Sequence, residues 1–315
     1  MYRLFWLLVI SLLLEAQEGM LTRQKVLMGT FVTISLNVKN KELMEPVFLL
    51  LKDIENSLSS YDKNTPISNL NSNKSTQLDR YSYEALYLSR LYYTKTHGYF
   101  NIAIGKITKD IYHFGEDQRV ASKEELDKTS TAINGLIFNE YEAIISDSIK
   151  IDLGGMGKGY AVDKVTQFLK DRGVEKALIA LSGDIRCIGE CKIGVQNPFI
   201  EGKTLANFDL YESAVSTSGI YRRFVESQRY NHLINPKTKV SENNFISVTL
   251  ISDKLSSATL DAYATAISVM PLSEAYDFLN KQALAFIVLQ TDKKLLVSKN
   301  IHRYVKNLKL EGLCF

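Results

Sequence analysis

A glycine-rich segment in the middle of the chain has the residue types that a phosphate site needs. Four glycines and Lys158 lie between Ile151 and Asp163, where an apolar stretch gives way to a helical pattern. Glycine has no Cβ, so backbone N–H groups can approach a phosphate closely, and a helix N-terminus adds partial positive charge. The segment fails the P-loop and dinucleotide patterns, because Asp152 and Tyr160 stand where those patterns need glycine. A tight turn that needs glycine only for its backbone angles is the alternative interpretation.

A carboxylate and a hydroxyl, those of Asp261 and Thr265, lie four residues apart in a stretch with helical periodicity. On a helix this spacing places both groups on one face, one turn apart. Mg²⁺ usually takes one or two protein carboxylates and completes its shell with water and substrate phosphates, so the pair could hold a hard cation. An Asp that is buried or caps the helix, beside an ordinary helical Thr, is the alternative that the residues leave open.

Other polar residues could take part in acid–base chemistry or ligand binding. Asp152 and Asp184 lie beside glycines at the ends of predicted strands, where ligand sites gather, whereas Asp163 lies inside the helical pattern and is expected to be structural. His232 could be a general base or a positioning group, although a lone histidine is more often structural. The four histidines have no metal-ligand spacing, which disfavours a zinc enzyme. Residues 216–219 could offer hydroxyl and N–H groups to a phosphate, but a plain turn explains them equally well.

The elements that would position these residues alternate between strands and helices. Periodicity and turn signals predict strands at 25–37, 148–153, 177–181, 246–252 and 284–290, helices at 42–58, 82–97, 158–171, 256–270 and 273–281, a loop over 59–73, and a hairpin region from 214 to 234. Strand 148–153, the following helix and strand 177–181 suggest a crossover unit. No linker or repeat divides the chain, so we expect a single α+β unit.

Composition and the N-terminus limit the possible classes of protein. The 315 residues are 45% hydrophobic, enough for a substantial core, and the net charge of +3 without basic runs excludes nucleic-acid binding. Met1 to Leu14 has the layout of a signal peptide, with Arg3 followed by an apolar run that is short for a membrane span. We therefore expect residues 1–19 to be a signal peptide or an uncleaved N-terminal anchor, and residues 20–315 to form the functional domain of an exported protein.

Three cysteines, Cys187, Cys191 and Cys314, have no metal-ligand spacing. Cys187 and Cys191 could pair if a hairpin brought them together in an oxidising compartment. Free thiols are the default expectation.

In their order along the chain, these segments resemble the FAD:protein FMN transferase family, also called ApbE-like. The resemblance is carried by Met28-Gly29-Thr30, Ser60-Tyr61, residues 98–102, residues 151–163, Ser182-Gly183-Asp184, residues 216–219 with Tyr221, residues 232–236 with Thr238, and Asp261-Ala262 with Thr265. Ordered matches of this kind are more specific than any single short motif. Two positions depart from the family's common residues: Asn101 replaces an Asp, and Ser182 replaces the first glycine of Gly-Gly-Asp.

The resemblance implies a fold, an activity and a set of site residues. The fold would be a single compact ApbE-like (T-fold-like) α+β domain of mixed sheets with flanking helices. The activity would be that of an exported, periplasmic, magnesium-dependent enzyme, which splits FAD and attaches FMN to a Thr or Ser of a target protein, such as a subunit of a membrane redox complex, and releases AMP. By family position, flavin contacts are implied at Met28, Tyr61, Tyr99, Phe100, Asn101, Asp152, Lys158 and Ile234. Magnesium is implied at Asp261, Thr265 and an oxygen of the Gly155 region, with His232 or Asp184 as the candidate base.

Two other functions stay open at this point. Magnesium-dependent hydrolysis of FAD to FMN and AMP would use the same site, with water in place of the protein hydroxyl. An exported FAD-binding protein that does no chemistry would need no metal pair, so Asp261 and Thr265 argue mildly against it.

Overall fold

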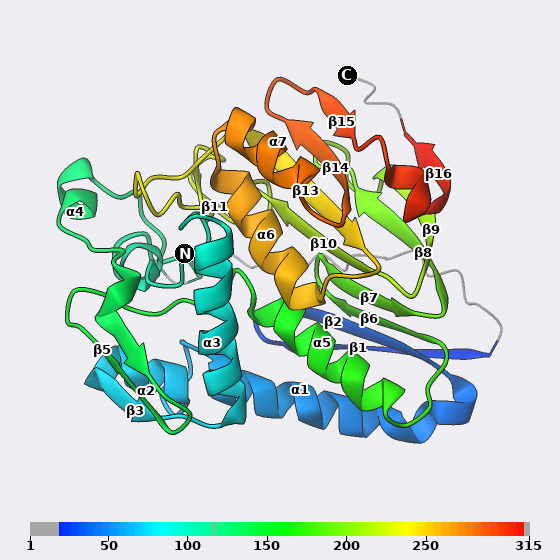
Figure 1. Cartoon of the computed structure of the whole chain (residues 1–315), viewed down its shortest axis with the longest axis horizontal. Helices are drawn as coiled ribbons and strands as arrows, with labels where there is room; N and C mark the ends of the chain where they lie inside the picture. Colours follow the sequence, from blue (N-terminus) through cyan, green and yellow to red (C-terminus); the bar gives the residue numbers. More distant parts are fainter. Residues whose placement is uncertain (1–18, 116, 312–315) are drawn as a thin grey trace, which may run out of the picture.

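Eight antiparallel strands form the central sheet of the computed structural model, which describes residues 19–115 and 117–311 (Figure 1). The sheet order is β1 (Met20–Leu27), β2 (Thr30–Asn37), β6 (Ala177–Leu181), β7 (Asp184–Ile188), β10 (Ala214–Gly219), β13 (Phe245–Ser252), β14 (Ala285–Gln290) and β15 (Leu295–Val297). Residues 1–18 of the expected leader, which is predicted over 1–19, and Cys314 lie outside the described residues. Among those described, no helix is long and apolar enough to cross a membrane.

Helices cover one face of this sheet, as Figure 1 shows. They are α1 (Met44–Leu58), α3 (Arg80–Lys95), α5 (Gly157–Lys170), α6 (Ser257–Val269) and α7 (Leu272–Asn280). A second sheet, in the order β16 (Lys306–Leu310), β9 (Thr204–Tyr211) and β8 (Glu190–Gln196), packs on the opposite face. Strand β14 consequently alternates: Phe286 and Val288 pack in the cluster under the helices, whereas Ile287 and Leu289 pack in the cluster under the small sheet. Burial on both faces explains why the central strands are almost continuously hydrophobic.

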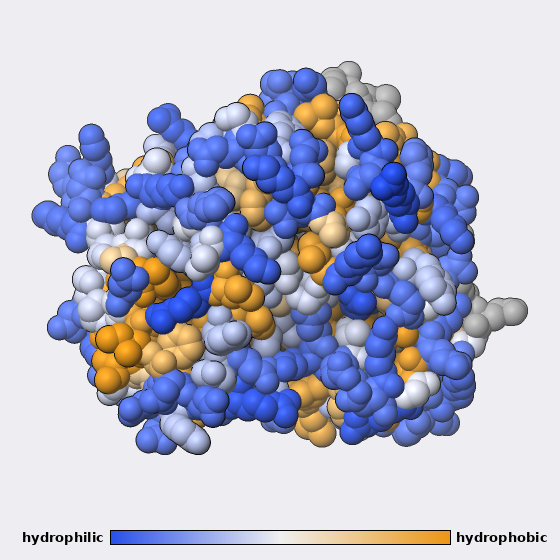
Figure 2. Space-filling model, viewed as in Figure 1, coloured by the Kyte–Doolittle hydropathy of each residue, from blue (hydrophilic) through white to orange (hydrophobic). Residues whose placement is uncertain are grey.

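Shorter elements complete the fold. They are α2 (Pro66–Asn73), the three-stranded sheet of β3 (Ser75–Gln77), β5 (Glu142–Ile145) and β4 (Leu136–Phe138), a π-helical turn (Lys106–Ile111), α4 (Lys123–Asp127), the pair β11 (Phe224–Val225) and β12 (Tyr230–Asn231), and 3₁₀ turns at Val38–Leu43, Ile133–Gly135 and Ile301–Arg303. The three-stranded sheet leaves the paired Ile137 and Ile144 exposed, and Figure 2 shows hydrophobic atoms over this region on an otherwise largely hydrophilic face.

The predicted helices are confirmed to within a few residues, but several other predictions are wrong. Residues 25–37 form a hairpin, because Met28 and Gly29 both take positive φ angles, of 53° and 67°, and turn the chain between β1 and β2. The loop predicted over 59–73 contains α2, which begins at Pro66 and is capped by the Thr65 hydroxyl. The predicted crossover unit is absent from the described residues, since β6 pairs antiparallel with both β2 and β7.

The predicted strand at 148–153 is also wrong, although its alternate residues are buried. The Asn71 side chain bonds the N–H and C=O of Ile151 at 2.6 and 2.8 Å, and the carbonyl of Ile102 accepts the Asp152 N–H at 2.8 Å. Side-chain and loop partners thus satisfy this extended backbone in place of a neighbouring strand. Buried residues alternate in this segment although it pairs with no strand, so alternation alone does not establish one.

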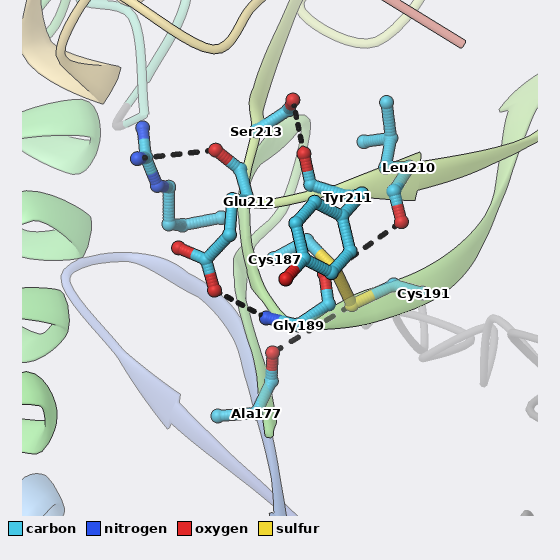
Figure 3. Close-up of a disulfide and its surroundings, with 9 residues drawn as sticks. Ala177, Cys187, Gly189, Cys191, Leu210, Tyr211, Glu212 and Ser213 are labelled. Carbon is cyan, nitrogen blue, oxygen red and sulfur yellow. Dashed lines mark hydrogen bonds between the residues drawn. A yellow bond between two sulfur atoms is a disulfide. The ribbon is translucent and has the colours of Figure 1, made fainter. Parts of the chain in front are cut away.

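The expectation of free thiols is wrong for Cys187 and Cys191, which form a disulfide with a Cα–Cα distance of 6.0 Å (Figure 3). The two residues flank the turn from β7 into β8. Gly189 makes that turn possible with a φ of 71°, and a Cβ at this position would lie 2.7 Å from the Glu175 carbonyl oxygen. The bond fastens the small sheet to the central one.

Candidate active site

A cleft of about 2480 Å³ brings together residues that are distant in the sequence. It contains every site residue predicted from the sequence except one: it is lined by Met28, Tyr61, Tyr99, Phe100, Asn101, Asp152, Gly155, Lys158, His232, Ile234, Asp261 and Thr265, whereas Asp184 lies behind its wall. The cleft continues along β2 and β8, where Thr33 and Gly194 line it. The glycine segment, the Asp261 helix and the His232 loop therefore belong to one site.

Helices α5 and α6 meet at the floor of the cleft. Asp261 accepts the Gly159 N–H through Oδ2 at 3.1 Å, and the Thr265 hydroxyl donates to the Gly155 carbonyl at 3.4 Å. A Cβ on Gly159 would lie 2.3 Å from the Ser257 carbonyl oxygen, so only glycine lets the helices approach this closely. The glycine segment thus serves helix packing as well as ligand access, and its N–H at position 159 is already bonded to protein.

Two buried carboxylates share one lysine beside this contact. The Lys158 ammonium lies 3.0 Å from Asp184 Oδ2 and 3.2 Å from Asp261 Oδ2. Ser216, directly opposite Asp184 on β10, donates to Asp184 Oδ1 at 2.6 Å. Both oxygens of Asp184 are thereby engaged, and its side chain is 2% exposed, so the geometry makes Asp184 a group that holds Lys158. The cluster of three ionisable groups carries a net charge of −1 when all are ionised.

The cluster shifts the pKa values of its members. Burial, and after it the charge of Asp184, raise the pKa of Asp261 to about 7, although Lys158 and the Gly159 N–H act in the opposite direction. Burial alone would lower the pKa of Lys158, but the two carboxylates outweigh it and raise that pKa above its usual range. Lys158 therefore remains a cation at neutral pH.

Asp152 anchors the loop that enters α5. Its Oδ2 accepts the Thr108 hydroxyl at 2.6 Å and its Oδ1 accepts the Gly154 N–H at 2.9 Å. Burial by itself would raise the pKa of Asp152, but the Lys109 charge and these two hydrogen bonds outweigh it and lower the pKa. Asp152 is therefore an ionised acceptor at one wall of the cleft.

His232 is held in one tautomer by its neighbour. Its Nδ1 lies 3.0 Å from the Arg223 carbonyl oxygen, which can only accept, so Nδ1 carries the proton and Nε2 keeps its lone pair. Burial lowers the pKa of His232 to about 4, and the Arg223 charge acts in the same direction. The imidazole is neutral at pH 7 and can accept a proton.

The remaining predicted contacts form an aromatic wall. Tyr99, Phe100, Asn101 and Ile234 are almost wholly buried, and Asn101 closes a turn by donating to the Thr131 carbonyl at 2.8 Å and accepting the Ala103 N–H at 2.8 Å. Asn101 therefore shapes the wall through its bonds to backbone.

Tyr61 lies at the mouth of the cleft, 53% exposed, and its hydroxyl donates to the Phe114 carbonyl at 3.1 Å. Arg223 donates to that hydroxyl at 3.0 Å, and the Lys109 ammonium stands 3.9 Å from the centre of the Tyr61 ring. Met28 reaches the cleft from the β1–β2 turn, where the Glu55 carboxylate accepts its N–H at 2.5 Å.

Sequence reasoning missed four residues of the site: Glu55, Thr108, Lys109 and Arg223. Each acts on a group far away in the chain, as Thr108 does on Asp152. None belongs to a motif, and only the one-turn π-helix that carries Thr108 and Lys109 is an unusual local feature. No spacing in the sequence could have identified them.

Known proteins resemble this chain over most of its length. A family model described as the ApbE family matches residues 28–288. The FAD:protein FMN transferase of Klebsiella pneumoniae is 28% identical over 239 residues, with 72% of this chain and 76% of that protein covered. The one from Vibrio cholerae is 28% identical over 298 residues, with 84% and 87% covered. The crystal structure of the ApbE protein from Thermotoga maritima superposes with a TM-score of 0.83 at 25% identity, over 91% of this chain and 100% of that one.

Proposed function

The chain belongs to the ApbE family, and on that basis we propose that it is a flavin transferase, which cleaves FAD and attaches FMN to a protein acceptor. The observation that carries the proposal is the buried Lys158, Asp184 and Asp261 cluster at the floor of a cleft lined by aromatic residues. The lysine can bind phosphate oxygens, and the aromatic side chains can cover ring systems. The cleft is larger than the ~300–1,000 Å³ of a usual small-molecule site. It can therefore accept a protein segment beside the dinucleotide.

Magnesium is the metal that these residues fit. The candidate ligands, which are the Gly155 carbonyl, the Thr265 hydroxyl and the Asp261 carboxylate, are all hard oxygens, and the carboxylate belongs to a cluster with net negative charge. Within the described part of the chain, no group of three or more His, Cys, Asp and Glu residues could hold a metal. Such a sparse protein share suits Mg²⁺, which keeps waters and substrate phosphates. When bound, the ion would neutralise the pyrophosphate and the leaving phosphate.

The chain's own groups can support transfer of the FMN phosphoryl group to an acceptor hydroxyl. We propose that His232 Nε2 takes the proton of an acceptor Thr or Ser hydroxyl, whose oxygen attacks the phosphorus of the FMN half. The bond from that phosphorus to the bridging oxygen breaks, and AMP leaves with the electron pair. Lys158, held cationic between its two carboxylates, binds phosphate oxygens and stabilises their charge.

The two alternative functions fit less well. A carrier would place a pyrophosphate beside two carboxylates that share one lysine, and when both carboxylates are ionised the cluster repels the pyrophosphate unless a cation intervenes. A hydrolase would need no room beyond FAD and water. Both alternatives remain outcomes of the experiment below.

We further propose that the protein is exported to the periplasm and that its acceptors are subunits of membrane redox complexes. The Cys187–Cys191 disulfide supports an oxidising compartment. Secretion of a fusion that carries residues 1–19 ahead of a reporter tests the export signal, and a reporter retained in the cytoplasm would argue against it.

The test of the activity is incubation of the full chain with FAD, Mg²⁺ and an acceptor domain that carries a Thr, followed by mass spectrometry. A mass gain of one FMN on the acceptor supports the transferase, free FMN supports the hydrolase, and intact bound FAD supports the carrier. The acceptor with Thr replaced by Val is the control. Asp261→Asn keeps the shape of the side chain and should abolish metal-dependent turnover; full activity of that variant would remove Asp261 from the metal site.

A further inference from the structure

One carboxylate beside the site, that of Asp163, takes no part in the proposed reaction and binds none of the proposed ligands. Asp163 on α5 accepts the backbone N–H of Ser257 at 2.8 Å and that of Ala258 at 2.9 Å. These are the first two N–H groups of α6, the helix that carries Asp261 and Thr265. A helix leaves such groups without partners of its own, so Asp163 supplies a cap from a different helix.

The two helices cap each other. Asp163 of α5 binds the start of α6, and Asp261 of α6 binds the Gly159 N–H at the start of α5. Three contacts follow in order, the first from the turn that precedes α5 and the next two from α5 itself: residue 155 with 265, residue 159 with 261, and residue 163 with 257. The first residue number rises by four and the second falls by four at each step, which is about one helical turn, so the contacts form a ladder in which α5 and α6 run in opposite directions.

Position 159 makes the ladder tight. A side chain there would collide with the backbone of Ser257 and Ala258, the same two residues whose N–H groups Asp163 holds. Asp163 therefore clamps α6 where it touches α5, one turn from the Asp261 carboxylate. A shift of α6 along α5 would break both carboxylate contacts together.

A second cap on the same helix end contacts α6 itself and Tyr92 of α3, but not α5. The Ser256 hydroxyl accepts the Thr259 N–H at 3.1 Å. This bond contributes to the stability of α6 and makes no link to α5. Ser256 thus provides a matched control, because its loss weakens the same helix terminus without freeing the ladder.

We propose that Asp163 is a positioning residue for the reaction: it fixes the register of α6 on α5 and so holds the Asp261 carboxylate and the Thr265 hydroxyl opposite Lys158 and Gly155. This inference rests on the proposed function for its effect on magnesium binding. Its effect on the hydrogen bond between the Gly159 N–H and the Asp261 carboxylate does not depend on any metal.

The test compares Asp163→Asn with Ser256→Ala in the full chain. The Asn amide keeps one acceptor but turns an N–H toward a backbone donor, which leaves that donor unpaired. We expect hydrogen exchange at the Gly159 amide, which lies on the other helix, to accelerate at least tenfold in Asp163→Asn, and the Kd for Mg²⁺ alone, measured by titration calorimetry, to rise at least tenfold. In Ser256→Ala both quantities should stay within about twofold, although that variant also melts at a lower temperature.

Equal changes in the two variants, or wild-type exchange at Gly159 in Asp163→Asn, would overturn the proposal. If the wild-type protein binds no Mg²⁺, the proposed metal fails while the exchange at Gly159 still decides the role of Asp163. Should Asp163→Asn not fold, Asp163→Glu keeps both acceptors one methylene further out. Faster exchange at Gly159 in that variant supports the proposal, and unchanged exchange refutes it.

Discussion

Replacing Gly159 by Ala isolates the contact between α5 and α6 with the smallest possible side chain. The added Cβ would stand 2.3 Å from the Ser257 carbonyl oxygen, whereas real Cβ atoms essentially never approach within 3.0 Å. The helices must therefore separate by roughly 1 Å, a displacement of the size that can slow a reaction about a hundredfold when it misplaces catalytic groups. The separation acts directly on Asp261, whose carboxylate bonds the same residue's N–H.

Two effects on stability oppose each other in this variant. Overpacking costs about 1–3 kcal/mol, and replacing a helical glycine by alanine returns about 0.5–1 kcal/mol. We expect a net loss of about 1–2 kcal/mol, measured by urea denaturation, together with an approximately hundredfold fall in FMN transfer at saturating FAD.

Gly157 is the matched control on the same helix, because nothing lies within 4 Å of a Cβ placed there. Gly157→Ala should leave the free energy of unfolding unchanged or raise it by up to about 1 kcal/mol. The reasoning is refuted if Gly159→Ala is as stable as the wild type and retains turnover within about threefold, or if both alanine variants lose the same stability.

Three further predictions concern other parts of the chain. His232 has a pKa of about 4 in the folded state against 6.5 unfolded, so the unfolded chain binds more protons between these values. Stability should fall by at most about 3 kcal/mol as the pH drops through that range; urea denaturation at several pH values would show a flatter profile for His232→Gln, and an unchanged profile would contradict the assignment. Replacing Cys187 and Cys191 by Ser should lower the free energy of unfolding by about 2 kcal/mol, the loop-entropy value for so short a loop, and an unchanged urea midpoint would argue against it. Met28→Asn should keep the melting temperature near that of wild type, because Asn-Gly favours this left-handed turn. The same variant should bind FAD more weakly in a fluorescence titration. Wild-type affinity for FAD would show that Met28 does not contact the ligand.

The helices of this fold could be predicted from the sequence because their signals are local. The 3.6-residue pattern gives α1, α3, α5 and α6, and Gly98 and Gly173 mark helix ends with positive φ angles. The pairing of the strands is not local: β2 lies beside β6, which follows it by more than a hundred residues. The sequence pattern does not predict strand β8 and its partners, and it indicates a strand at 148–153 because periodicity does not reveal what satisfies the backbone.

The candidate site was predictable only within single elements. Spacing by four residues put Asp261 and Thr265 on one helical face, and the structure confirms that they share it. That spacing does not reveal the partner on the neighbouring helix: Lys158, which the resemblance implies on the ligand, also lies between two carboxylates. Arg223 belongs to no motif, and it acts on His232 through both its backbone carbonyl oxygen and its side-chain charge.

The antiparallel ladder of α5 and α6 restricts where the chain can change in length. Insertion or deletion of one residue within the helical stretches 157–163 or 257–265 would rotate every later contact by about 100° around its helix and remove it from the interface. The exposed turn between β8 and β9, around residues 198–203, has no such restriction. The ladder corresponds to a sequence pattern in two parts, Gly-x₃-Gly-x₃-Asp and, much later in the chain, Ser-x₃-Asp-x₃-Thr. Each residue of the first part contacts one residue of the second part. A search that requires both halves tests for a pair of touching helices, which neither half alone can do.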